Sequence, residues 1–405
     1  MPSAMLEGQP APSDGSLAEQ ARSEIAHRPF GIYIHVPFCT TRCGYCDFNT
    51  YTAAELGTEP GASRAGYVDA AISELELATR VLGPDAPEVS TIFVGGGTPT
   101  VLPPDDLGRL ITAVRERFGL AENAEVTTES NPESIDAAGL RRLRERGFNR
   151  ISFGMQSVVP HVLATLDRTH LPGRAQQAVA EAKAAGFANT SLDLIYGTPG
   201  ESADDWRASL DAALAASPEH ISAYALIVEQ GTRLAARIRR GDLPPPNDDD
   251  LADKYLIAEE RLTDAHYTAY ELSNWSTSSA TRCRHNLSYW RSDHWWGIGP
   301  GAHSHVGGVR WWNVKHPQTY ASRLSEGKSP AHAREVLTPE DKRVERILLE
   351  LRLADGLATS LLTSTERDRI ADLSVRGLAT VQDGKLILTL GGRLVADGVI
   401  RDLID

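Results

Sequence analysis

The sequence predicts an α/β fold in which short parallel strands alternate with helices to form an open, partial barrel of the (β/α)6 type. Strands that alternate with helical segments favour parallel pairing with crossover connections. The chain has 405 residues, of which 41% are hydrophobic and 23% charged, and this composition suits one large domain with a full core and a small second one. The six predicted strands span residues 31–36, 91–94, 125–129, 150–153, 190–195 and 220–223.

The segments around these strands support the assignment in chain order. Residues 1–28 are rich in Ala, Ser, Gly, Pro and Glu without an apolar core, so we expect a flexible tail and no signal peptide. In the first strand, Tyr33 and His35 share one face and the aliphatic residues take the other. After Pro103 and Pro104, apolar residues recur at helical spacing and predict a helix. These residues are Leu107, Leu110, Ile111, Val114 and Phe118.

The barrel, residues 29–240, is followed by a region of different texture. A stretch rich in Pro and Asp at 243–250 begins another helix. From 267 to 312 the chain is rich in Trp, His, Asn and Gly, which suits extended segments and loops around a ligand pocket. We therefore treat residues 241–335 as an extension of the barrel.

Residues 336–405 predict a small C-terminal domain of winged-helix-like shape. An amphipathic helix is followed by a hairpin-like turn at Asp383 and Gly384. Winged helices often bind DNA, but this one lacks a concentrated basic face, and the formal net charge of the chain is −13. We therefore expect no nucleic-acid binding, and an interaction or lid role for this domain.

Three of the four cysteines, Cys39, Cys43 and Cys46, stand within eight residues directly after the first strand. Cysteine thiolates are the usual ligands of iron-sulfur clusters. A C-x3-C-x2-C run without a fourth local cysteine predicts a [4Fe-4S] cluster that is held at three of its irons. The open iron of such a cluster can bind and reduce S-adenosylmethionine.

Structural zinc is the alternative, with Cys283, His35 or His285 as the fourth ligand of a closed tetrahedral site. Zinc sites more often bring cysteines as separated C-x2-C pairs, which favours the cluster. The few cysteines give no disulfide framework and suit a reduced cytoplasm, the location that we predict. No apolar run is long enough to predict a transmembrane segment.

Polar residues and glycines stand at the carboxyl ends of several predicted strands, where the active sites of such barrels gather. Glycines at 95–97 follow the second strand and expose backbone groups. Glu129 ends the third strand, Gln156 follows the fourth, and Asp193 lies in the fifth, with Arg168 one helical segment after the fourth. Such groups can hold hydroxyls, an ammonium and a carboxylate. The alternative is a structural network at the barrel mouth.

Six segments together resemble the radical SAM family that holds oxygen-independent coproporphyrinogen III oxidase and the HemW-type heme chaperones. They read GIYIHVPFCTTRCGYCDF, GGGTP, TTESNP, ISFGMQS, LDLIYGTPGE and CRHNLSYW. The resemblance implies a radical SAM barrel, a [4Fe-4S] cluster on the three cysteines and contacts to S-adenosylmethionine. The implied contacts are Tyr33, Tyr45, Phe48, Gly96, Gly97, Thr98, Glu129, Gln156, Arg168, Asp193, Ala225 and His303.

Two features distinguish the branches of this family. The oxidase branch carries a cysteine motif of the form C-x3-C-x2-C-x-C. In this sequence Phe48 stands at the position of the fourth cysteine. The chaperone branch carries an H-N-x-x-Y-W signature, present here as His285, Asn286, Tyr289 and Trp290. Both favour a chaperone that delivers heme to respiratory acceptor proteins at the membrane surface, either alone or as a homodimer. The alternatives are radical decarboxylation of coproporphyrinogen III in porphyrin biosynthesis, and a protein with a silent cluster.

Heme binding agrees with the aromatic texture of the extension. A porphyrin is a large, flat, apolar disk, and a histidine can reach its iron axially. His285 is the first candidate for that ligand, followed by His303 and His305. The residues expected to flank the disk are Tyr289, Trp290, Trp295 and Trp296. The alternative is that these Trp and His residues only close the barrel.

Overall fold

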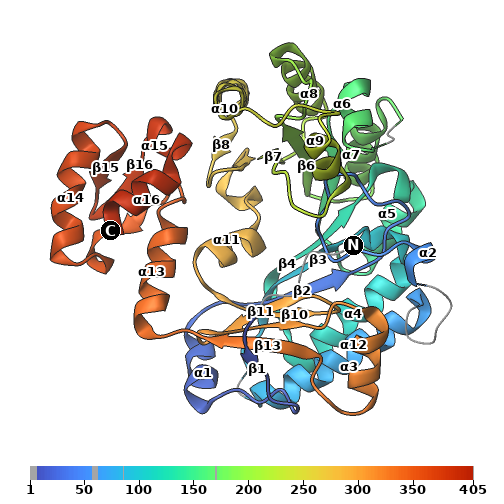
Figure 1. The fold of residues 1–405 in the computed structure, drawn as a ribbon. Coiled ribbons are helices and arrows are strands. Elements are labelled where there is room, and N and C mark those ends of the chain that lie inside the picture. The colour runs from blue at the N-terminus through green and yellow to red at the C-terminus, as the bar shows by residue number, and fades with distance from the viewer. Residues whose placement is uncertain (1–6, 57–62, 85, 169–170, 405) are drawn as a thin grey trace.

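The computed structural model describes residues 7–56, 63–84, 86–168 and 171–404, and its centre is one large sheet with helices along its outer side (Figure 1). Six parallel strands run in sequence order through the middle of a 13-stranded sheet. They are β2 (Phe30–Val36), β3 (Val89–Gly96), β4 (Leu120–Ser130), β5 (Arg150–Gln156), β6 (Asn189–Tyr196) and β7 (His220–Ala225). Each predicted strand lies within the observed one, so the predicted (β/α)6 fold is confirmed.

Helices connect these strands and cover the outer face of the sheet. In α4 (Pro104–Phe118) the residues predicted from helical spacing are buried, and two aspartates occupy the first turn, where they complement the helix dipole. Gly119, at φ 75°, ends the helix in a conformation that glycine adopts without strain. The other helices of this part are α2 (Ala53–Leu56), α3 (Arg64–Leu82), α5 (Ala137–Glu145), α6 (Pro160–Thr165), α7 (Arg174–Ala184) and α8 (Ala203–Ala215).

β2 illustrates how each strand separates the core from the barrel interior. Ile32, Ile34 and Val36 are 0% exposed and belong to the main apolar cluster. Tyr33 and His35 lie on the other face, and the Tyr33 hydroxyl and His35 Nδ1 are 2.9 Å apart. The alternation predicted for this strand is therefore present, because successive side chains of a strand point to opposite faces.

Residues of the extension complete both edges of the parallel sheet. β9 (Asn274–Ser276) pairs antiparallel with β7, whereas β10 (His294–Ile298) pairs in parallel with β2 at the opposite edge. Three further antiparallel strands continue from β10. The remaining elements are α9 (Arg233–Arg239), α10 (Asp248–Asp264), β8 (Thr268–Ala269), α11 (Arg284–Trp290), β11 (His303–Val306), β12 (Val309–Asn313), α12 (Pro317–Ser325) and β13 (Ala331–Val336). The expectation of only loops and extended segments is wrong for α11.

Residues 7–28 are not the free tail that the composition predicts. β1 (Gln9–Pro10) pairs antiparallel with β13. α1 (Glu19–Glu24) buries Ala21, and the next residue, Ile25, is 3% exposed within the main core. A few apolar side chains and one strand pairing thus hold this polar segment against the body. The first six residues of the predicted tail lie outside the described residues.

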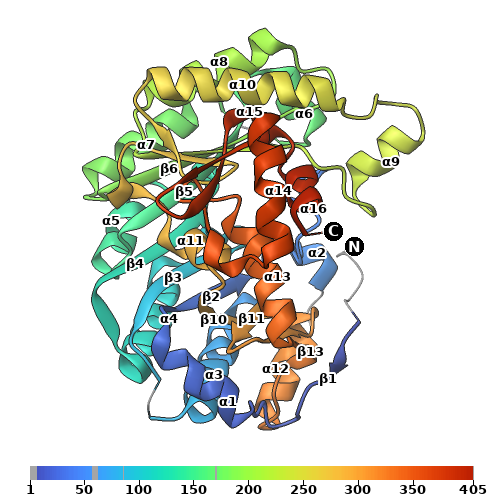
Figure 2. The ribbon, with the colours of Figure 1, turned by 90° about the vertical axis from the view of Figure 1, so that its left-hand side faces the viewer.

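The C-terminal residues form a small lobe with its own apolar core, which lies beside α11 in both ribbon views (Figures 1 and 2). Its three-stranded antiparallel sheet has the order β14-β16-β15. The predicted turn residues Asp383 and Gly384 have φ values of 49° and 74°, which suit a two-residue hairpin. The elements are α13 (Pro339–Glu350), β14 (Leu357–Ala358), α14 (Ser364–Val375), β15 (Ala379–Gln382), β16 (Lys385–Leu388), α15 (Leu390–Leu394) and α16 (Ala396–Ile404). This arrangement agrees with the winged-helix-like prediction.

The helices found in the described parts of the chain include none with the length and apolar character that crossing a lipid bilayer requires.

One buried carboxyl group fastens α3 to the extension. Glu74 is 1% exposed and accepts hydrogen bonds from the Gly299 N–H, the Asn313 side-chain amide and the Tyr320 hydroxyl. Burial raises the pKa of Glu74 to about 7, although these donors act in the opposite direction. The carboxyl group therefore keeps its proton at a pH where an exposed glutamate has lost it.

We expect Glu74 to make the native state less stable as the pH rises from about 5 to 8. The folded chain holds this proton up to about pH 7, whereas the unfolded chain releases it near the ordinary value of 4.5, so ionisation favours unfolding in that window. Urea unfolding at pH 5.5 and 8 should give a smaller pH-dependent loss for Glu74→Gln than for the wild type. Glu76→Gln, on the exposed side of the same helix, is the control. Equal losses in all three proteins would contradict the assignment.

Candidate functional site

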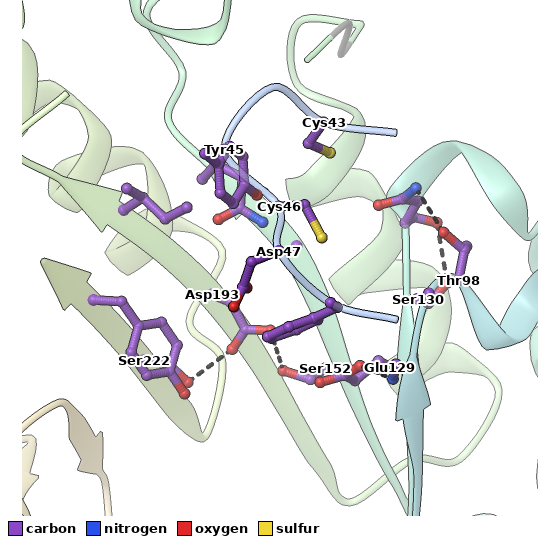
Figure 3. Close-up of a pocket in the computed structure, with 18 of the residues that line it drawn as sticks. Cys43, Tyr45, Cys46, Asp47, Thr98, Glu129, Ser130, Ser152, Asp193 and Ser222 are labelled. Atoms are coloured by element: carbon purple, nitrogen blue, oxygen red, sulfur yellow. Dashed lines mark hydrogen bonds between the residues drawn. The ribbon is translucent and has the colours of Figure 1, made fainter. Parts of the chain in front are cut away.

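The carboxyl ends of the parallel strands open into one cavity of about 610 Å³. Side chains from the loop after β2 and from each later parallel strand face it (Figure 3). Five of the residues predicted to contact S-adenosylmethionine or heme do not line it: Trp290, Trp295, Trp296, His303 and His305. Those that line it are Tyr33, Cys39, Cys43, Tyr45, Cys46, Phe48, Gly96, Gly97, Thr98, Glu129, Gln156, Arg168, Asp193, Ala225, His285, Asn286 and Tyr289.

The loop that carries the three cysteines is held by backbone hydrogen bonds from outside it. The Cys39 N–H donates to the Tyr51 carbonyl at 3.0 Å, and the Gly44 N–H donates to the Leu166 carbonyl at 3.1 Å. The four cysteines of the chain all lie in described segments, and none forms a disulfide. Figure 3 shows the sulfurs of Cys43 and Cys46 turned toward the cavity. The loop thus presents three free thiols to one space, as cluster binding requires.

The carboxyl end of β3 packs directly on this loop. A Cβ atom at Gly97 would lie 2.4 Å from the Phe38 carbonyl oxygen and 3.0 Å from Cys39 Sγ, so only glycine fits. The Thr98 N–H donates to the Phe38 carbonyl at 2.8 Å. The glycines at 95–97 were predicted to expose backbone groups at the strand end. Of these three, the position with the least room in the structure, Gly97, supports the cysteine loop.

The fourth ligands proposed for the zinc alternative are engaged elsewhere. The His35 ring nitrogens face the Tyr33 hydroxyl and the Asn49 carbonyl, each at 2.9 Å. Cys283 Sγ lies 3.7 Å from Glu125 Oε1, and burial raises the pKa of this thiol to about 12, so Cys283 is a buried thiol. Across the described segments, no three His, Cys, Asp or Glu side chains, the three loop cysteines included, are arranged to hold one metal ion. In a [4Fe-4S] cluster each of these cysteines would bind a different iron.

Two carboxyl groups lie on neighbouring walls of the cavity. Glu129 Oε2 accepts the Gly96 N–H at 3.1 Å, and burial, with a smaller contribution from the Asp193 charge, raises the Glu129 pKa to about 8. Asp193 accepts the hydroxyls of Ser152 and Ser222 at 2.8 and 2.7 Å, as Figure 3 shows. Because Glu129 holds a proton at neutral pH, it can donate a hydrogen bond to a ligand as well as accept one.

Arg168 bridges the cysteine loop and the barrel wall. Its guanidinium lies 3.3 Å from Cys43 Sγ and donates to Asn131 Oδ1 at 2.9 Å and to the Gly154 carbonyl at 3.0 Å. The predicted role of Arg168, paired hydrogen bonds to a ligand carboxylate, is not tested by these contacts. They place its charge beside the predicted metal ligands.

α11 carries most of the H-N-x-x-Y-W signature to the floor of the cavity. The Glu125 carboxylate accepts the Arg284 and His285 N–H groups at 2.9 and 3.0 Å, so it caps the helix and fixes its position. His285 is 1% exposed, with Nδ1 2.8 Å from Thr91 Oγ1 and Nε2 2.8 Å from the Tyr289 hydroxyl. Burial lowers the His285 pKa to about 3, so the imidazole is neutral.

The predicted heme residues are therefore only partly brought together. Both ring nitrogens of His285 already have partners, so an axial bond to iron requires that the contact with Thr91 or the one with Tyr289 be broken. Trp290 packs outside the cavity against a small apolar cluster with Tyr270. His303 stacks on Trp312 at 5.9 Å between ring centroids, away from the cavity lining.

Several cavity residues were not singled out from the sequence. Ser152 and Ser222 could have been found from the inward strand register that they share with Glu129 and Asp193. Arg150 is the first residue of β5. A charged residue at that position is typical of the end of a strand and does not by itself indicate a functional role. Tyr224 and Ile227 line the cavity from the end of β7, and nothing in their local pattern marks them as functional.

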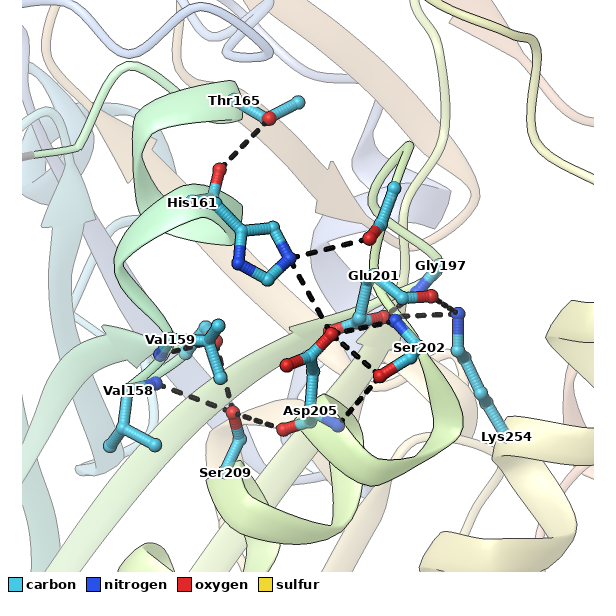
Figure 4. Close-up of polar contacts among 12 residues, drawn as sticks. Val158, Val159, His161, Thr165, Gly197, Glu201, Ser202, Asp205, Ser209 and Lys254 are labelled. Carbon is cyan, nitrogen blue, oxygen red and sulfur yellow. Dashed lines mark hydrogen bonds and ion pairs between the residues drawn. The ribbon is translucent and has the colours of Figure 1, made fainter.

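The Gly-Thr-Pro-Gly loop after β6 is anchored by a buried lysine (Figure 4). The Gly197 N–H donates to Glu201 Oε2 at 2.7 Å. Lys254 Nζ lies 3.3 Å from that same oxygen and 2.6 Å from Asp250 Oδ2, and its side chain is 1% exposed. This cation therefore connects α10 to the loop at the carboxyl end of β6.

Figure 4 also shows a serine, a histidine and an aspartate close together. Ser202 Oγ donates to Asp205 Oδ2 at 2.7 Å and accepts the Asp205 N–H at 3.1 Å, which is a capping box at the start of α8. His161 Nε2 lies 3.4 Å from Asp205 Oδ2, and no hydrogen bond joins it to Ser202 in the described segments. Since a serine nucleophile needs its base within reach, this group caps a helix.

Comparisons with known proteins agree with this geometry. Residues 33–213 match the Radical SAM superfamily. The heme chaperone HemW of Mycobacterium tuberculosis is 51% identical over 377 residues, which cover 93% of this chain and 95% of that protein. The heme chaperone HemW of Bacillus subtilis is 31% identical over 91% of this chain and 97% of its own length.

The solved structure of coproporphyrinogen III oxidase (HemN) from Escherichia coli, a radical SAM enzyme, superposes with a TM-score of 0.80. It covers 96% of this chain and 94% of its own, at 24% sequence identity. The likeness therefore extends over the extension and the C-terminal lobe as well as the barrel, and it concerns the fold alone.

The Lys254 anchor should contribute strongly to stability. Replacing Lys254 by Met leaves the buried Glu201 carboxylate without its cation, and loss of one partner of a buried pair costs roughly 3–5 kcal/mol. The free energy of urea unfolding at pH 7 measures the effect. Arg207→Met is the control, because Arg207 pairs with Asp204 at the exposed surface of α8, where such a pair contributes about 1 kcal/mol or less. Equal effects of the two substitutions would contradict the anchoring role.

Proposed function

The chain belongs to the HemW family of heme chaperones within the radical SAM superfamily, and from this premise we propose that it binds heme and delivers it to acceptor proteins. The resident cofactors that we propose are a [4Fe-4S] cluster and S-adenosylmethionine. The observation that carries the cofactor proposal is the convergence of the three cysteine thiols with the polar strand ends on one cavity. The identity of 51% over most of the chain supports the chaperone class.

Cys39, Cys43 and Cys46 are the proposed ligands of the cluster. The thiols are free, and the Gly97 backbone lies close to Cys39 Sγ, so the strand end supports the loop without covering the cavity side. Burial raises the pKa of the Cys46 thiol to about 12, and thiols in such a setting become thiolates by binding metal. When bound, an iron-sulfur cluster with an open iron binds and reduces S-adenosylmethionine.

The proposed contacts to S-adenosylmethionine follow the walls of the cavity. Glu129 and Asp193 offer hydrogen-bonding groups to hydroxyls or an ammonium, and Arg168 lies beside the cysteine loop with its charge. The remaining proposed contacts, apart from His303, also line the cavity. They are Tyr33, Tyr45, Phe48, Gly96, Gly97, Thr98, Gln156 and Ala225. His303 stays a prediction from the resemblance.

The proposed heme site lies at the mouth of the same cavity. Phe48, Tyr224 and Ile227 line the cavity and are nevertheless 58%, 44% and 68% exposed. Large apolar side chains that stay exposed around a cavity mark a ligand or partner site. A flat porphyrin would cover them, and the floor residues Asn286 and Tyr289 lie deeper in the same space.

The finer points of the chaperone cycle are proposals from the resemblance. We propose respiratory heme proteins at the membrane surface as acceptors, the cytoplasm as the site of action and a homodimer as one working state. Residues 336–405 are proposed as an interaction or lid module. Their lobe lies beside α11, which reaches the cavity floor, and this position supports that role.

A heme titration on anaerobic, cluster-reconstituted protein tests the proposal. We expect saturable heme absorbance in the wild type and at least a fivefold higher Kd in the double variant Phe48→Ser, Ile227→Ser, because each exchange removes apolar contact area worth roughly 1 kcal/mol or more. Iron and labile sulfide per chain should not change. Val375→Ser is the control, since Val375 is 88% exposed on the distant α14.

Product analysis separates the chaperone from the oxidase. With reductant, S-adenosylmethionine and coproporphyrinogen III, we expect no protoporphyrinogen from the reconstituted protein. Formation of that product would support the oxidase alternative. A protein with an intact cluster that binds no heme would contradict the proposed chaperone function. A protein that contains zinc in place of iron and sulfide would contradict both the chaperone and the oxidase functions.

A further inference from the structure

We propose that Arg150, on the floor of the cavity, binds a carboxylate group of the ligand. The inference rests on the proposed function, because tetrapyrroles of the heme type carry propionate groups and S-adenosylmethionine carries a carboxylate as well. The shared chemistry is a carboxylate held by the two-pronged guanidinium of an arginine, which matches its geometry. The experiment below separates the two sources.

The position of Arg150 in β5 points its side chain into the barrel. Arg150, Ser152 and Gly154 occupy alternate positions, so they share the inward face of the strand, and all three line the cavity. Arg150 is only 3% exposed. Its charge is therefore removed from bulk water and directed toward the ligand space.

The guanidinium of Arg150 has no hydrogen bond or ion pair with any residue in the described ranges, and its Nε is buried without an acceptor. Lys254 is the other fully buried cation of those ranges, and it is paired with Glu201 and Asp250. A buried charge without a partner is strongly unfavourable. A chain retains such a group where a ligand supplies the missing partner, and a cavity is where a ligand can do so.

Glu125 acts on Arg150 electrostatically, but its carboxylate is committed to another element. Both of its oxygens accept backbone N–H groups at the start of α11, from Arg284 and His285. The Cys283 thiol also lies near Arg150, and burial raises its pKa to about 12, so it is neutral. Neither group therefore provides a paired anion for the guanidinium.

Asp193 is the other carboxylate that acts on Arg150. Its two oxygens accept the hydroxyls of Ser152 and Ser222, at 2.8 and 2.7 Å. These hydrogen bonds hold the Asp193 carboxylate on the β5–β7 wall, outside ion-pairing distance of Arg150. The prongs of the guanidinium thus stay available to a carboxylate that enters the cavity.

His220, which also lines the cavity floor, is neutral and therefore neither pairs with Arg150 nor competes with it for an anion. His220 Nδ1 lies 2.8 Å from Ser191 Oγ, and Nε2 lies 2.8 Å from the Tyr270 hydroxyl. Burial, with a smaller contribution from the Arg150 charge, lowers the His220 pKa well below its ordinary value. His220 therefore adds no charge beside Arg150, whose charged neighbours are the Glu125 and Asp193 carboxylates, neither of them in an ion pair with it. The buried setting strengthens the attraction of the guanidinium for an anion that enters the cavity.

The test compares ligands with and without the carboxylate on reconstituted full-length protein. Heme is titrated beside heme dimethyl ester, and S-adenosylmethionine beside its decarboxylated analogue, for the wild type, Arg150→Met and Arg150→Lys. We expect the wild type to bind heme or S-adenosylmethionine more tightly than the matched analogue that lacks the free carboxylate. Arg150→Met should bind that acid roughly tenfold to a hundredfold more weakly, with no change for the analogue. Arg150→Lys should retain part of the preference.

The outcomes are distinguishable. If Arg150→Met loses the preference for heme over its dimethyl ester, Arg150 binds a propionate. If it loses the preference for S-adenosylmethionine over the decarboxylated analogue, Arg150 binds the carboxylate of the methionine part. Equal weakening of the acid and of its analogue without the carboxylate, or no preference in the wild type, would overturn the inference and leave Arg150 a structural residue. If the wild type binds no heme at all, the proposed chaperone function fails and the second ligand pair still decides the role of Arg150. Arg174→Met, which replaces a paired arginine outside the cavity, should keep the wild-type preference.

Discussion

The position of the cysteine loop depends on a close backbone contact between the ends of β2 and β3. The Gly97 N–H donates to the Val36 carbonyl and the Thr98 N–H to the Phe38 carbonyl, both at 2.8 Å. A side chain at position 97 would collide with the Phe38 carbonyl. The position of the Cys39 thiol is therefore set by main-chain geometry, which is more rigid than a side-chain contact. The positions of Cys43 and Cys46 follow from their short distance along the loop.

The barrel interior differs from an ordinary core because it buries charged and polar groups at successive strand ends. Hydrogen bonds hold two of these groups in the cavity wall: Glu129 accepts a backbone N–H, and Asp193 accepts two serine hydroxyls. The low-dielectric surroundings raise the Glu129 pKa, so the walls carry less negative charge than their composition indicates. Such an interior is shaped by ligand chemistry, while the outer strand faces and helices supply the stability.

The strands and their inward faces could be predicted from the sequence because each is a short apolar run with a fixed period of two. The cysteine loop could be singled out because the spacing of its three cysteines is local, and their role as cluster ligands stays a prediction. α11 could not, since only Arg284 and Leu287 among its seven residues are strong helix formers, and its capping carboxylate, Glu125, lies far away in the sequence. The role of the N-terminal segment was missed for a similar reason. Its pairing with β13 spans more than three hundred residues, and composition carries no information about such contacts.

The parallel pairing of β10 with β2 has a consequence for the order in which the molecule is made. The strand that leads into the cysteine loop is among the first to leave the ribosome, yet one of its two neighbours ends only at Ile298. Long-range pairings of this kind form late. During translation β2 thus presents an open edge, and nascent chains carry reactive thiols on an unfinished scaffold. If the three cysteines hold the proposed cluster, insertion of its iron and sulfide is best suited to the released chain, after β10 has closed that edge.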